Sequence, residues 1–413
     1  MRPTKPRVLL VSDYYPPLIG GATRAAQLLA RGLAGRGYAV AVATTWQPGT
    51  PLRELDEEGF EVHRLRGLTM RMSRLSANRY RRIPPPFPDP ELVWGLRKLV
   101  RRLQPDVVHS SGWLSYSCSV ALLGTRVPLV LAGRDYGPVC AVGSLVRSDG
   151  QVCDGPELRK CLACSGDYYG AAKGAVAVAG VFGGRRLLRA KVRGLQSVSR
   201  HEQSVLHRHL LDGATVDTVI PDFRVESGDR PDESVLGRLP EEPFILFVGA
   251  LRQIKGIGVL LEAYERLTAP PPLVILGSRA PDMPTRFPRG VTVEYDVSHA
   301  TVMAAWERAL FGVAPSVLPE PLGNVVHEAM SRGKPVIGTA ASGHEEMIED
   351  GVDGLLVPGG HLDGLVDAMR LLIEDGAFRR RLGEAARVHA ERFTAEAQLP
   401  NFDLLFDRVL AAR

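Results

Sequence analysis

The sequence predicts an α/β protein with two doubly wound domains, each built on a parallel sheet covered by helices on both faces. Its 413 residues are too many for one ordinary domain of about 100–200 residues. Short apolar runs alternate with helical patterns, as in parallel sheets. A polar, Pro-containing segment then interrupts the alternation, which restarts behind it. We expect a first domain over 1–222, a linker over 223–243, a second domain over 244–394 and a final helix over 395–413.

In the first domain, the apolar run 7–13 has the pattern of a buried parallel strand. A Pro- and Gly-rich turn follows, then a helical pattern over 23–36 and a second strand over 39–45, which together form a βαβ unit. The segment 91–103 carries leucines on one helical face. Further strands are expected at 60–65, 106–110, 128–132, 195–199 and 215–221.

The second domain repeats this alternation. Strands are expected at 244–250, 273–278, 291–295, 311–316, 334–339 and 354–358, with helices at 256–267, 299–308, 324–332 and 361–374 and helical sequence after 376. In doubly wound sheets, ligands bind at the carboxyl ends of the strands. The cleft between the two domains is therefore the expected site.

Composition narrows the function classes. A hydrophobic content of 45% with 23% charged residues is typical of a folded protein, and a net charge of +5 is too mild to indicate nucleic-acid binding. Basic residues concentrate between Arg64 and Arg102, and aromatic residues there are too few to stack single-stranded nucleic acid. This stretch is either a solvated surface or a contact for anionic lipid or an acidic acceptor.

Membrane-spanning segments are not expected. The apolar run near the amino terminus is too short for a signal peptide, and no stretch reaches about 18 apolar residues. The nearest, 170–184, is rich in Gly and Ala and is interrupted by Lys173, which predicts a buried packing segment. We expect a cytoplasmic protein, at most peripheral to a membrane.

The most informative stretch is PSVLPEPLGNVVHEAMSRGKP, which begins at Pro315. Glu320 precedes a turn in which Gly323 lets the backbone approach a ligand, and Asn324 is expected to cap the following helix. The positive amino end of that helix suits a diphosphate. Glu328, about one turn into the helix, can accept from vicinal ribose hydroxyls, and Glu320 can bind the sugar. This pattern predicts a nucleotide-sugar site. The alternative is that Glu320 only caps the helix and that Glu328 is a solvated surface residue.

The same stretch resembles family-4 glycosyltransferases of the GT-B fold, the glycosyl transferases group 1, whose hallmark is Glu-x7-Glu within EPxGxxxxE. Glu320 and Glu328 match the two glutamates, and the register continues for more than forty residues, through GKPV from Gly333 and DGxxGLLVP from Asp350. The resemblance implies two facing Rossmann-like domains with an interdomain cleft, a last helix that packs back on the first domain, and retaining hexosyl transfer.

The resemblance also extends to the loop GALRQIKG, which begins at Gly249. It implies that Lys255 pairs with the donor diphosphate. The family arginine is replaced by Ala250, so Arg252 is the candidate substitute, although it can equally point away. With Glu320, these two cations form the expected catalytic set. The expected donor-binding set is Glu328, Gly323, Asn324, Leu322, Gly277, Tyr295, Gly21 and Gly20.

The first domain departs from the family pattern on the acceptor side. Its segment PDVVHSSGWL resembles PDVVHxHxWL, with Ser111 in place of the second histidine, which usually contacts the donor sugar. His109 remains but lies deeper in the strand, which favours a structural role. In LAGRDY, Arg134 replaces a family histidine; it either binds an anionic group or forms an ion pair. Gly20-Gly21 matches the family's glycine-rich loop after the first strand.

Four cysteines lie within the loop expected at 137–166: Cys140, Cys153, Cys161 and Cys164. Cys118 stands apart and is expected to pack in a helix. The C-x2-C spacing favours a structural zinc ion, with disulfides and free thiols as alternatives. The resemblance implies that catalysis itself requires no metal or other cofactor.

The sequence therefore predicts a hexosyltransferase that uses a UDP- or GDP-linked sugar and a small-molecule, glycan or lipid-linked acceptor hydroxyl. Two alternatives share the fold: a sugar-nucleotide 2-epimerase and a non-catalytic sugar-nucleotide-binding subunit. A dehydrogenase is excluded because neither first strand is followed by GxGxxG.

Overall fold

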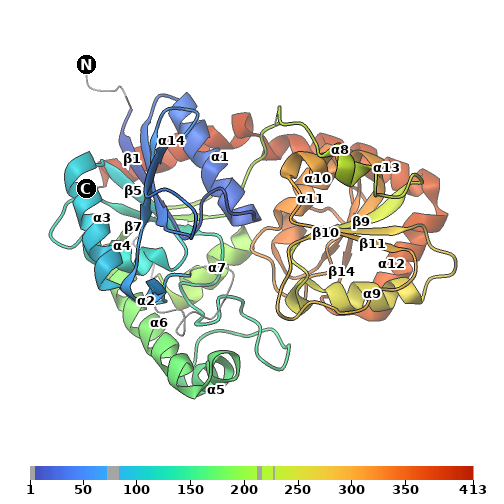
Figure 1. Ribbon diagram of the computed structural model, residues 1–413, viewed down its shortest axis with the longest axis horizontal. Helices are drawn as coiled ribbons and strands as arrows, with labels where there is room; N and C mark the ends of the chain where they lie inside the picture. Colours follow the sequence, from blue (N-terminus) through green and yellow to red (C-terminus); the bar gives the residue numbers. More distant parts are fainter. Residues whose placement is uncertain (1–4, 72–82, 212–215, 227, 413) are drawn as a thin grey trace. The chain divides into compact units, whose positions relative to one another are not determined.

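A computed structural model describes residues 5–71, 83–211, 216–226 and 228–412. The chain divides into two compact units. Unit 1 comprises Met1–Asp222 and Gln398–Arg413, and unit 2 comprises Phe223–Ala397. Figure 1 shows an α/β arrangement in each unit, with strands between helices. Each unit is described by itself below.

Unit 1 holds an eight-stranded sheet in the order β3-β4-β2-β1-β5-β6-β7-β8. The described pairings are parallel except β3 with β4. The strands are β1 (Arg7–Ser12), β2 (Ala39–Thr45), β3 (Arg53–Leu55), β4 (Glu61–Leu65), β5 (Val107–Ser111), β6 (Leu129–Gly133), β7 (Val192–Ser197) and β8 (Val216–Val219). From β1 the strand order first runs outward through β2 and β4, and it then continues on the other side of β1 with β5. The switch point of the sheet therefore lies between β1 and β5.

The leucine-bearing helix face predicted at 91–103 is buried in unit 1. In the third helix, Asp89 caps the amino end by accepting from the amides of Glu91 (2.9 Å) and Leu92 (3.2 Å), and Pro90 occupies the first turn. The helices are α1 (Gly21–Gly35), α2 (Leu68–Arg71), α3 (Pro90–Leu103), α4 (Leu114–Ala121), α5 (Leu158–Tyr169), α6 (Ala171–Lys191), α7 (Arg200–His209) and α14 (Ala395–Ala411).

The last helix completes the core of unit 1. Phe402 and Phe406 of α14 pack edge-on against the ring of His109 in β5, at centroid distances of 6.0 and 6.2 Å. Asp403 accepts hydrogen bonds from Lys5 (2.9 Å) and Tyr38 (2.6 Å) and pairs with Arg36. The Tyr38 hydroxyl and the two cations therefore tie α14 to the amino-terminal part of the chain.

Unit 2 holds a parallel six-stranded sheet in the order β11-β10-β9-β12-β13-β14. Its strands are β9 (Phe244–Val248), β10 (Leu273–Gly277), β11 (Val291–Tyr295), β12 (Ala309–Val313), β13 (Val336–Thr339) and β14 (Leu355–Val357). Its helices are α8 (Glu233–Leu236), η2 (Gln253–Lys255), α9 (Ile257–Glu265), α10 (His299–Arg308), α11 (Asn324–Ser331), η3 (Gly343–Glu346), α12 (Leu362–Glu374), α13 (Gly376–His389) and η4 (Ala390–Phe393).

The sheet of unit 2 is apolar on both faces, as the near-continuous apolar strands predict. Ile245 and Phe247 of β9 pack in one core with α9 and α12. On the opposite face, Trp306 of α10 lies fully buried against Gly312 of β12, where an added Cβ would come within 2.8 Å of the indole.

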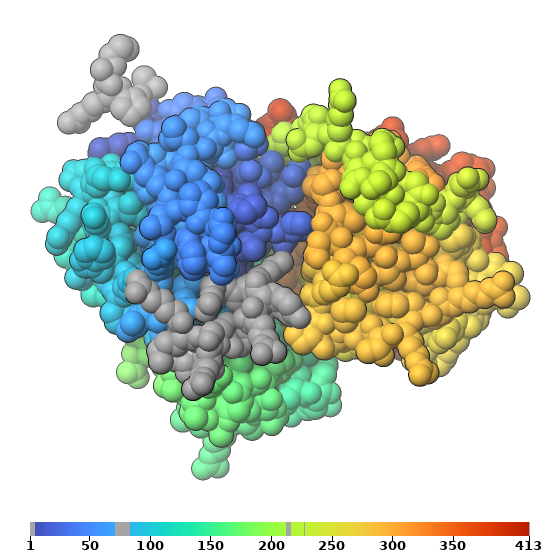
Figure 2. Space-filling model, in the orientation of Figure 1, coloured from blue at the N-terminus to red at the C-terminus, as the bar shows by residue number. Residues whose placement is uncertain are grey.

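The segment 223–243, predicted as a linker, groups with unit 2. It contains α8, and Figure 2 shows its yellow-green atoms lying on the orange surface of this unit. The Asp232 amide donates to the Thr301 hydroxyl (2.9 Å), and Arg238 pairs with Glu294 (2.6 Å). These contacts fix the segment on unit 2.

Three local expectations differ from the structure. The segment 137–166 was expected as a loop, but its last part forms α5, which carries Cys161 and Cys164. A short antiparallel strand, β3, was not expected. The segment 170–184 was expected as buried packing; it belongs to α6, which buries one face and exposes residues such as Val176. None of the helices within the described ranges is long and apolar enough to cross a membrane.

Candidate active site

Two loops of unit 2 meet at the switch point of its sheet. β9 and β12 are neighbours, and the chain leaving β9 continues to β10 on the other side. The loop after β9 carries Lys255, and the loop after β12 carries Glu320. Adjacent carboxyl ends of parallel strands on either side of a switch point form the usual ligand crevice of such sheets.

Backbone contacts lock these two loops together. The amides of Val317 and Leu318 both donate to the carbonyl of Ile254, each at 3.0 Å. Gly256 adopts a left-handed φ of 75°, and a Cβ there would lie 1.8 Å from the carbonyl oxygen of Pro315. The glycine after Lys255 is thus required by a close backbone approach, and this approach sets the position of the lysine.

Lys255 and Glu320 form an ion pair at 2.5 Å, and the Ser316 hydroxyl donates to the same oxygen, Oε1, at 2.6 Å. The Glu320 side chain is 7% exposed and that of Lys255 is 32% exposed. Burial raises the pKa of Glu320, but the Lys255 cation and the hydrogen bonds from both partners outweigh it and hold the pKa below its ordinary value. Glu320 is therefore a buried carboxylate with Oε2 outside these two bonds.

His344 lies close enough to Glu320 to interact with its charge, and it was not singled out from the sequence. It is buried, and its Nδ1 accepts from the amide of Thr339 at 3.0 Å, so the neutral ring carries its proton on Nε2. Burial lowers the pKa of His344 to about 4, and the nearby Glu320 only partly opposes this. Its place after Gly343, in the matched tail of the motif, is the signal that could have identified it.

The backbone of the turn between Glu320 and α11 requires glycine at position 323. Gly323 adopts φ 92°, and a Cβ there would lie 2.3 Å from Nε2 of His344. Gly323 is the N-cap of α11, and Asn324 is the first helical residue, so the expectation that Asn324 caps the helix is wrong. The reason is the tight passage over His344, which only glycine permits at the capping position. Leu322 is buried beside it.

Gly277 and Tyr295 end β10 and β11. A Cβ on Gly277 would lie 2.0 Å from the carbonyl oxygen of Gly249, so packing between strand ends already accounts for this glycine. Arg279 lies over the Tyr295 ring at 3.9 Å from its centroid. Arg252 is 41% exposed and faces Asp282 at 3.6 Å, so it is not in the Lys255 cluster.

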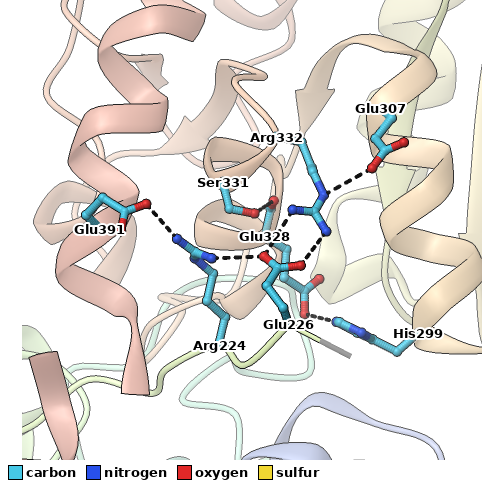
Figure 3. A network of polar contacts seen from close by, with 8 residues as sticks. All are labelled: Arg224, Glu226, His299, Glu307, Glu328, Ser331, Arg332 and Glu391. Carbon is cyan, nitrogen blue, oxygen red and sulfur yellow. Dashed lines mark hydrogen bonds and ion pairs between the residues drawn. The ribbon is translucent and has the colours of Figure 1, made fainter. Parts of the chain in front are cut away.

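Glu328 lies on the side of α11 that faces α10, and it borders a cavity of about 260 Å³. Figure 3 shows His299 pointing at its carboxylate, with Nε2 to Oε1 at 3.0 Å. Arg332, the C-cap of α11, forms a bidentate pair with Glu226 at 2.7 and 3.0 Å. Arg224 also contacts Glu226, at 3.0 Å. His299 was not singled out from the sequence because it lies 29 positions away.

In unit 1, the predicted acceptor-side residues have internal partners. His109 is buried, its Nε2 lies 3.3 Å from the side-chain oxygen of Gln196, and burial lowers its pKa to about 3. Arg134 forms a buried ion pair with Asp222. The Ser111 hydroxyl donates to that of Ser12 at 3.4 Å. Gly20 and Gly21 are exposed where α1 begins.

Three acids cluster at the switch point of unit 1 and were missed by sequence reasoning. Asp13 follows β1 and accepts from the amides of Trp113 (2.9 Å) and Leu114 (2.7 Å). Burial raises the pKa of Asp13 to about 7, and the neighbouring Asp135 adds to this. Glu202 is fully buried, and burial and then Asp135 raise its pKa well above the ordinary value. The ends of β1 and β6 and the first turn of α7 bring the three together.

The described residues contain no group of three or more His, Cys, Asp or Glu side chains placed to hold a metal ion. The predicted ligands Cys140, Cys153, Cys161 and Cys164 are free thiols, all partly exposed. They are nevertheless neighbours: burial raises the pKa of Cys161 and of Cys164, and Cys140 and Cys153 contribute to both shifts. Cys118 is buried in α4, as expected.

Part of the predicted basic surface, residues 72–82, lies outside the described residues. Arg64, at its start, is not a surface cation: it is buried, pairs with Glu54 at 2.6 Å and donates to the carbonyl of Pro16 at 2.6 Å.

Known glycosyltransferases are similar to this chain in sequence. The chain is similar to D-inositol 3-phosphate glycosyltransferases, with 26% identity to that of Kribbella flavida over 70% of this chain and 68% of the relative. The Pseudarthrobacter chlorophenolicus enzyme is likewise 26% identical, over 75% and 74%. The lipopolysaccharide core biosynthesis glycosyltransferase LpsE of Rhizobium meliloti is 28% identical over 37% and 46%.

Solved structures share the fold. Sucrose-phosphate synthase of Thermosynechococcus elongatus has a TM-score of 0.74 with 20% identity, covering 98% of this chain and 100% of that one. Anabaena Alr3699/HepE, in complex with UDP-glucose, has a TM-score of 0.68 with 17% identity, covering 98% and 100%. A family model for a glycosyl transferase 4-like domain matches residues 20–221, and one for glycosyl transferases group 1 matches residues 242–375. The chain belongs to the group 1 family of glycosyltransferases with the GT-B fold.

Proposed function

We propose that this protein transfers a hexosyl unit from a UDP- or GDP-linked sugar to an acceptor hydroxyl, with retention of the anomeric configuration. The observation that carries the proposal is the cluster of the half-buried Lys255 with the buried Glu320 and Ser316, beside the amino end of α11. A lone ion pair of this kind is often structural. Here it lies at a switch point, next to an amino-terminal helix end with no side-chain cap, and Glu328 follows five positions into that helix.

Each group has a role that its chemistry suits. Lys255 and the first amides of α11 neutralise the diphosphate, whose charge grows as the bond to the anomeric carbon breaks. Glu320, held by Ser316, accepts hydrogen bonds from hydroxyl groups of the sugar. Glu328 accepts from the ribose hydroxyls. Gly277 and Tyr295 border the nucleotide from the neighbouring strand ends.

The transfer step balances without a metal or other cofactor. The bond between the anomeric carbon and the diphosphate oxygen breaks, and the electron pair leaves with the diphosphate. The acceptor oxygen forms its bond to the same carbon from the same face, and its proton passes to the departing diphosphate. The Lys255 cation attracts the negative charge that collects on the departing diphosphate. Because the site is partly shielded from solvent, this attraction is stronger than it would be in water.

The acceptor side is proposed to be unit 1, with Gly20, Gly21 and Ser111 nearest the reacting groups. Arg134 is already paired with Asp222, which argues against a role as an anion receptor. The named acceptor of the inositol relatives carries a phosphate, whereas the switch point of unit 1 carries Asp13 and Asp135. A small-molecule, glycan or lipid-linked acceptor, and action in the cytoplasm beside a membrane, remain part of this proposal.

The first experiment is a thermal-shift panel of UDP, GDP and ADP with their glucose, galactose, mannose and N-acetylglucosamine derivatives. We expect one uridine or guanosine series to raise the midpoint, and the matching sugar nucleotide to release its nucleoside diphosphate when acceptors are added. Binding by none of the panel would refute the proposal.

The same reagents separate the two rival functions. A 2-epimerase converts the sugar nucleotide without any acceptor, so its product appears with donor alone. A binding subunit raises its midpoint with the nucleotide but releases no diphosphate with any acceptor. Anomeric configuration is then assigned from the proton coupling constant of the isolated product.

A further inference from the structure

The cavity of about 260 Å³ in unit 2 is bordered by Glu328 and by other polar side chains, such as His299, to which the proposed donor chemistry assigns no role. One side is formed by residues 224–226, Asp229 and Pro231, and the other two sides by α10 and by α11 with its C-cap. Both Glu328 and His299 line it, with their side chains in contact, and Figure 3 shows Glu226 between Arg224 and Arg332.

The contact between His299 and Glu328 is a directed one. Nε2 of His299 lies 3.0 Å from Oε1 of Glu328, and the side chains are 23% and 14% exposed. Since a carboxylate only accepts, Nε2 must carry a proton. Nδ1 is buried and makes no hydrogen bond to any of the residues that the structure describes. The imidazole therefore fixes one carboxylate oxygen from one side.

The helix that carries Glu328 is held independently of this contact. Arg332, the C-cap of α11, binds both oxygens of Glu226, and Arg224 links Glu226 to Glu391 at 3.0 Å. The Ser331 hydroxyl donates to the carbonyl of Glu328 at 2.7 Å. With the backbone fixed in this way, the remaining freedom of Glu328 is rotation of its side chain.

We infer that His299 is a positioning residue, which orients the Glu328 carboxylate so that it accepts from both vicinal hydroxyls of the donor ribose. The inference rests on the proposed function. To accept from hydroxyls on two neighbouring carbons, the carboxylate must take up one particular orientation toward them. A flexible glutamate side chain loses rotamer entropy when binding fixes it in that orientation. A histidine that holds Oε1 beforehand removes part of this cost.

The test compares a nucleotide that has both ribose hydroxyls with one that lacks them. Isothermal titration calorimetry is performed on the full chain with UDP and GDP, and with 2′,3′-dideoxy-UDP and 2′,3′-dideoxy-GDP. The variants are His299→Ala, His299→Gln and Glu328→Gln. Glu307→Gln is the matched control, because Glu307 lies on the same helix and borders the same cavity but is 66% exposed.

For the ribonucleotide that binds, His299→Ala should weaken affinity roughly tenfold, the value of one hydrogen bond to a charged group. The dideoxy analogue should bind wild type and His299→Ala equally. His299→Gln, whose amide N–H can replace Nε2–H, should recover most of the loss, and Glu307→Gln should change nothing. Circular dichroism confirms that each variant is folded.

Three outcomes overturn the inference. Equal losses for the ribonucleotide and its dideoxy analogue would mean that His299 only supports the cavity wall. Loss of the ribose preference in Glu328→Gln with no effect of His299→Ala would leave the proposed function intact and remove His299 from it. Failure of wild type to bind either ribonucleotide would refute the donor site itself.

Discussion

Replacing Lys255 by methionine is the perturbation that bears most directly on the proposed chemistry. The change keeps the length of the apolar stem and removes the cation that lies 2.5 Å from Glu320. If Lys255 neutralises the departing diphosphate, kcat should fall about 10²–10³-fold, which corresponds to roughly 3–4 kcal/mol of lost transition-state stabilisation. KM for the donor should rise less, because the charge is largest in the transition state.

The same change should also destabilise unit 2. Breaking a fully buried ion pair costs about 3–5 kcal/mol. The Lys255 side chain is 32% exposed, so solvent screens part of this, and we expect about 2 kcal/mol. The double variant Lys255→Met/Glu320→Gln removes the unpaired charge, so its urea midpoint should return toward that of wild type while its activity stays low.

Arg252→Met is the matched control in the same loop. Arg252 is more exposed and faces Asp282 at 3.6 Å, so its loss should change kcat less than about threefold and leave the urea midpoint unchanged. Turnover is measured as nucleoside diphosphate release with the donor found in the panel. If Arg252→Met abolishes turnover and Lys255→Met does not, our assignment of the phosphate cation is incorrect.

Three further predictions test the structure beyond this pair. Gly256→Ala and Gly351→Ala share φ values near 75°, but only Gly256 faces a backbone oxygen at 1.8 Å; calorimetric melting should show about 1 kcal/mol lost for Gly351 and clearly more for Gly256, and equal losses would contradict the loop contact. Because burial raises the pKa of Asp13 to about 7, the folded state retains a proton that the unfolded chain loses near pH 4; the stability of wild type relative to Asp13→Asn should fall by up to about 4 kcal/mol between pH 4 and 7 and then level off, as followed by urea unfolding, and a pH-independent difference would refute it. Native protein should react with Ellman's reagent at the four thiols of the cysteine-rich segment but not at Cys118, which is buried and whose pKa is about 12; a lower native count would reveal a metal or disulfides.

Much of the fold could be predicted because local patterns and tertiary structure agree. The helix over 299–308 begins and ends where expected, since Ser298 caps it by accepting from the amide of Thr301 at 3.2 Å. The fold class and the family followed from alternation and from the register around Glu320. The helix α5 was missed because its cysteines and charged residues carry no clear apolar stripe.

The candidate site was predictable only in part, because long-range contacts decide it. Gly323 was predicted to let the backbone approach a ligand, yet it also avoids a clash with His344, and Gly256, which was not singled out, avoids one with Pro315. The acids at the end of β1 and in α7 lie nearly 190 positions apart, and no local spacing indicates their proximity. The partner of Glu328, at the start of α10, was invisible for the same reason.

The return of α14 to unit 1 has a consequence for how the chain matures. The first 222 residues emerge from the ribosome without the two phenylalanines that cover His109 and without the acid that binds Lys5 and Tyr38. Unit 2, which is one continuous stretch, can acquire its full set of contacts earlier. Of the two units, unit 1 is therefore synthesised first but completed last, and a stop codon near position 398 should leave unit 2 intact while unit 1 lacks most of α14.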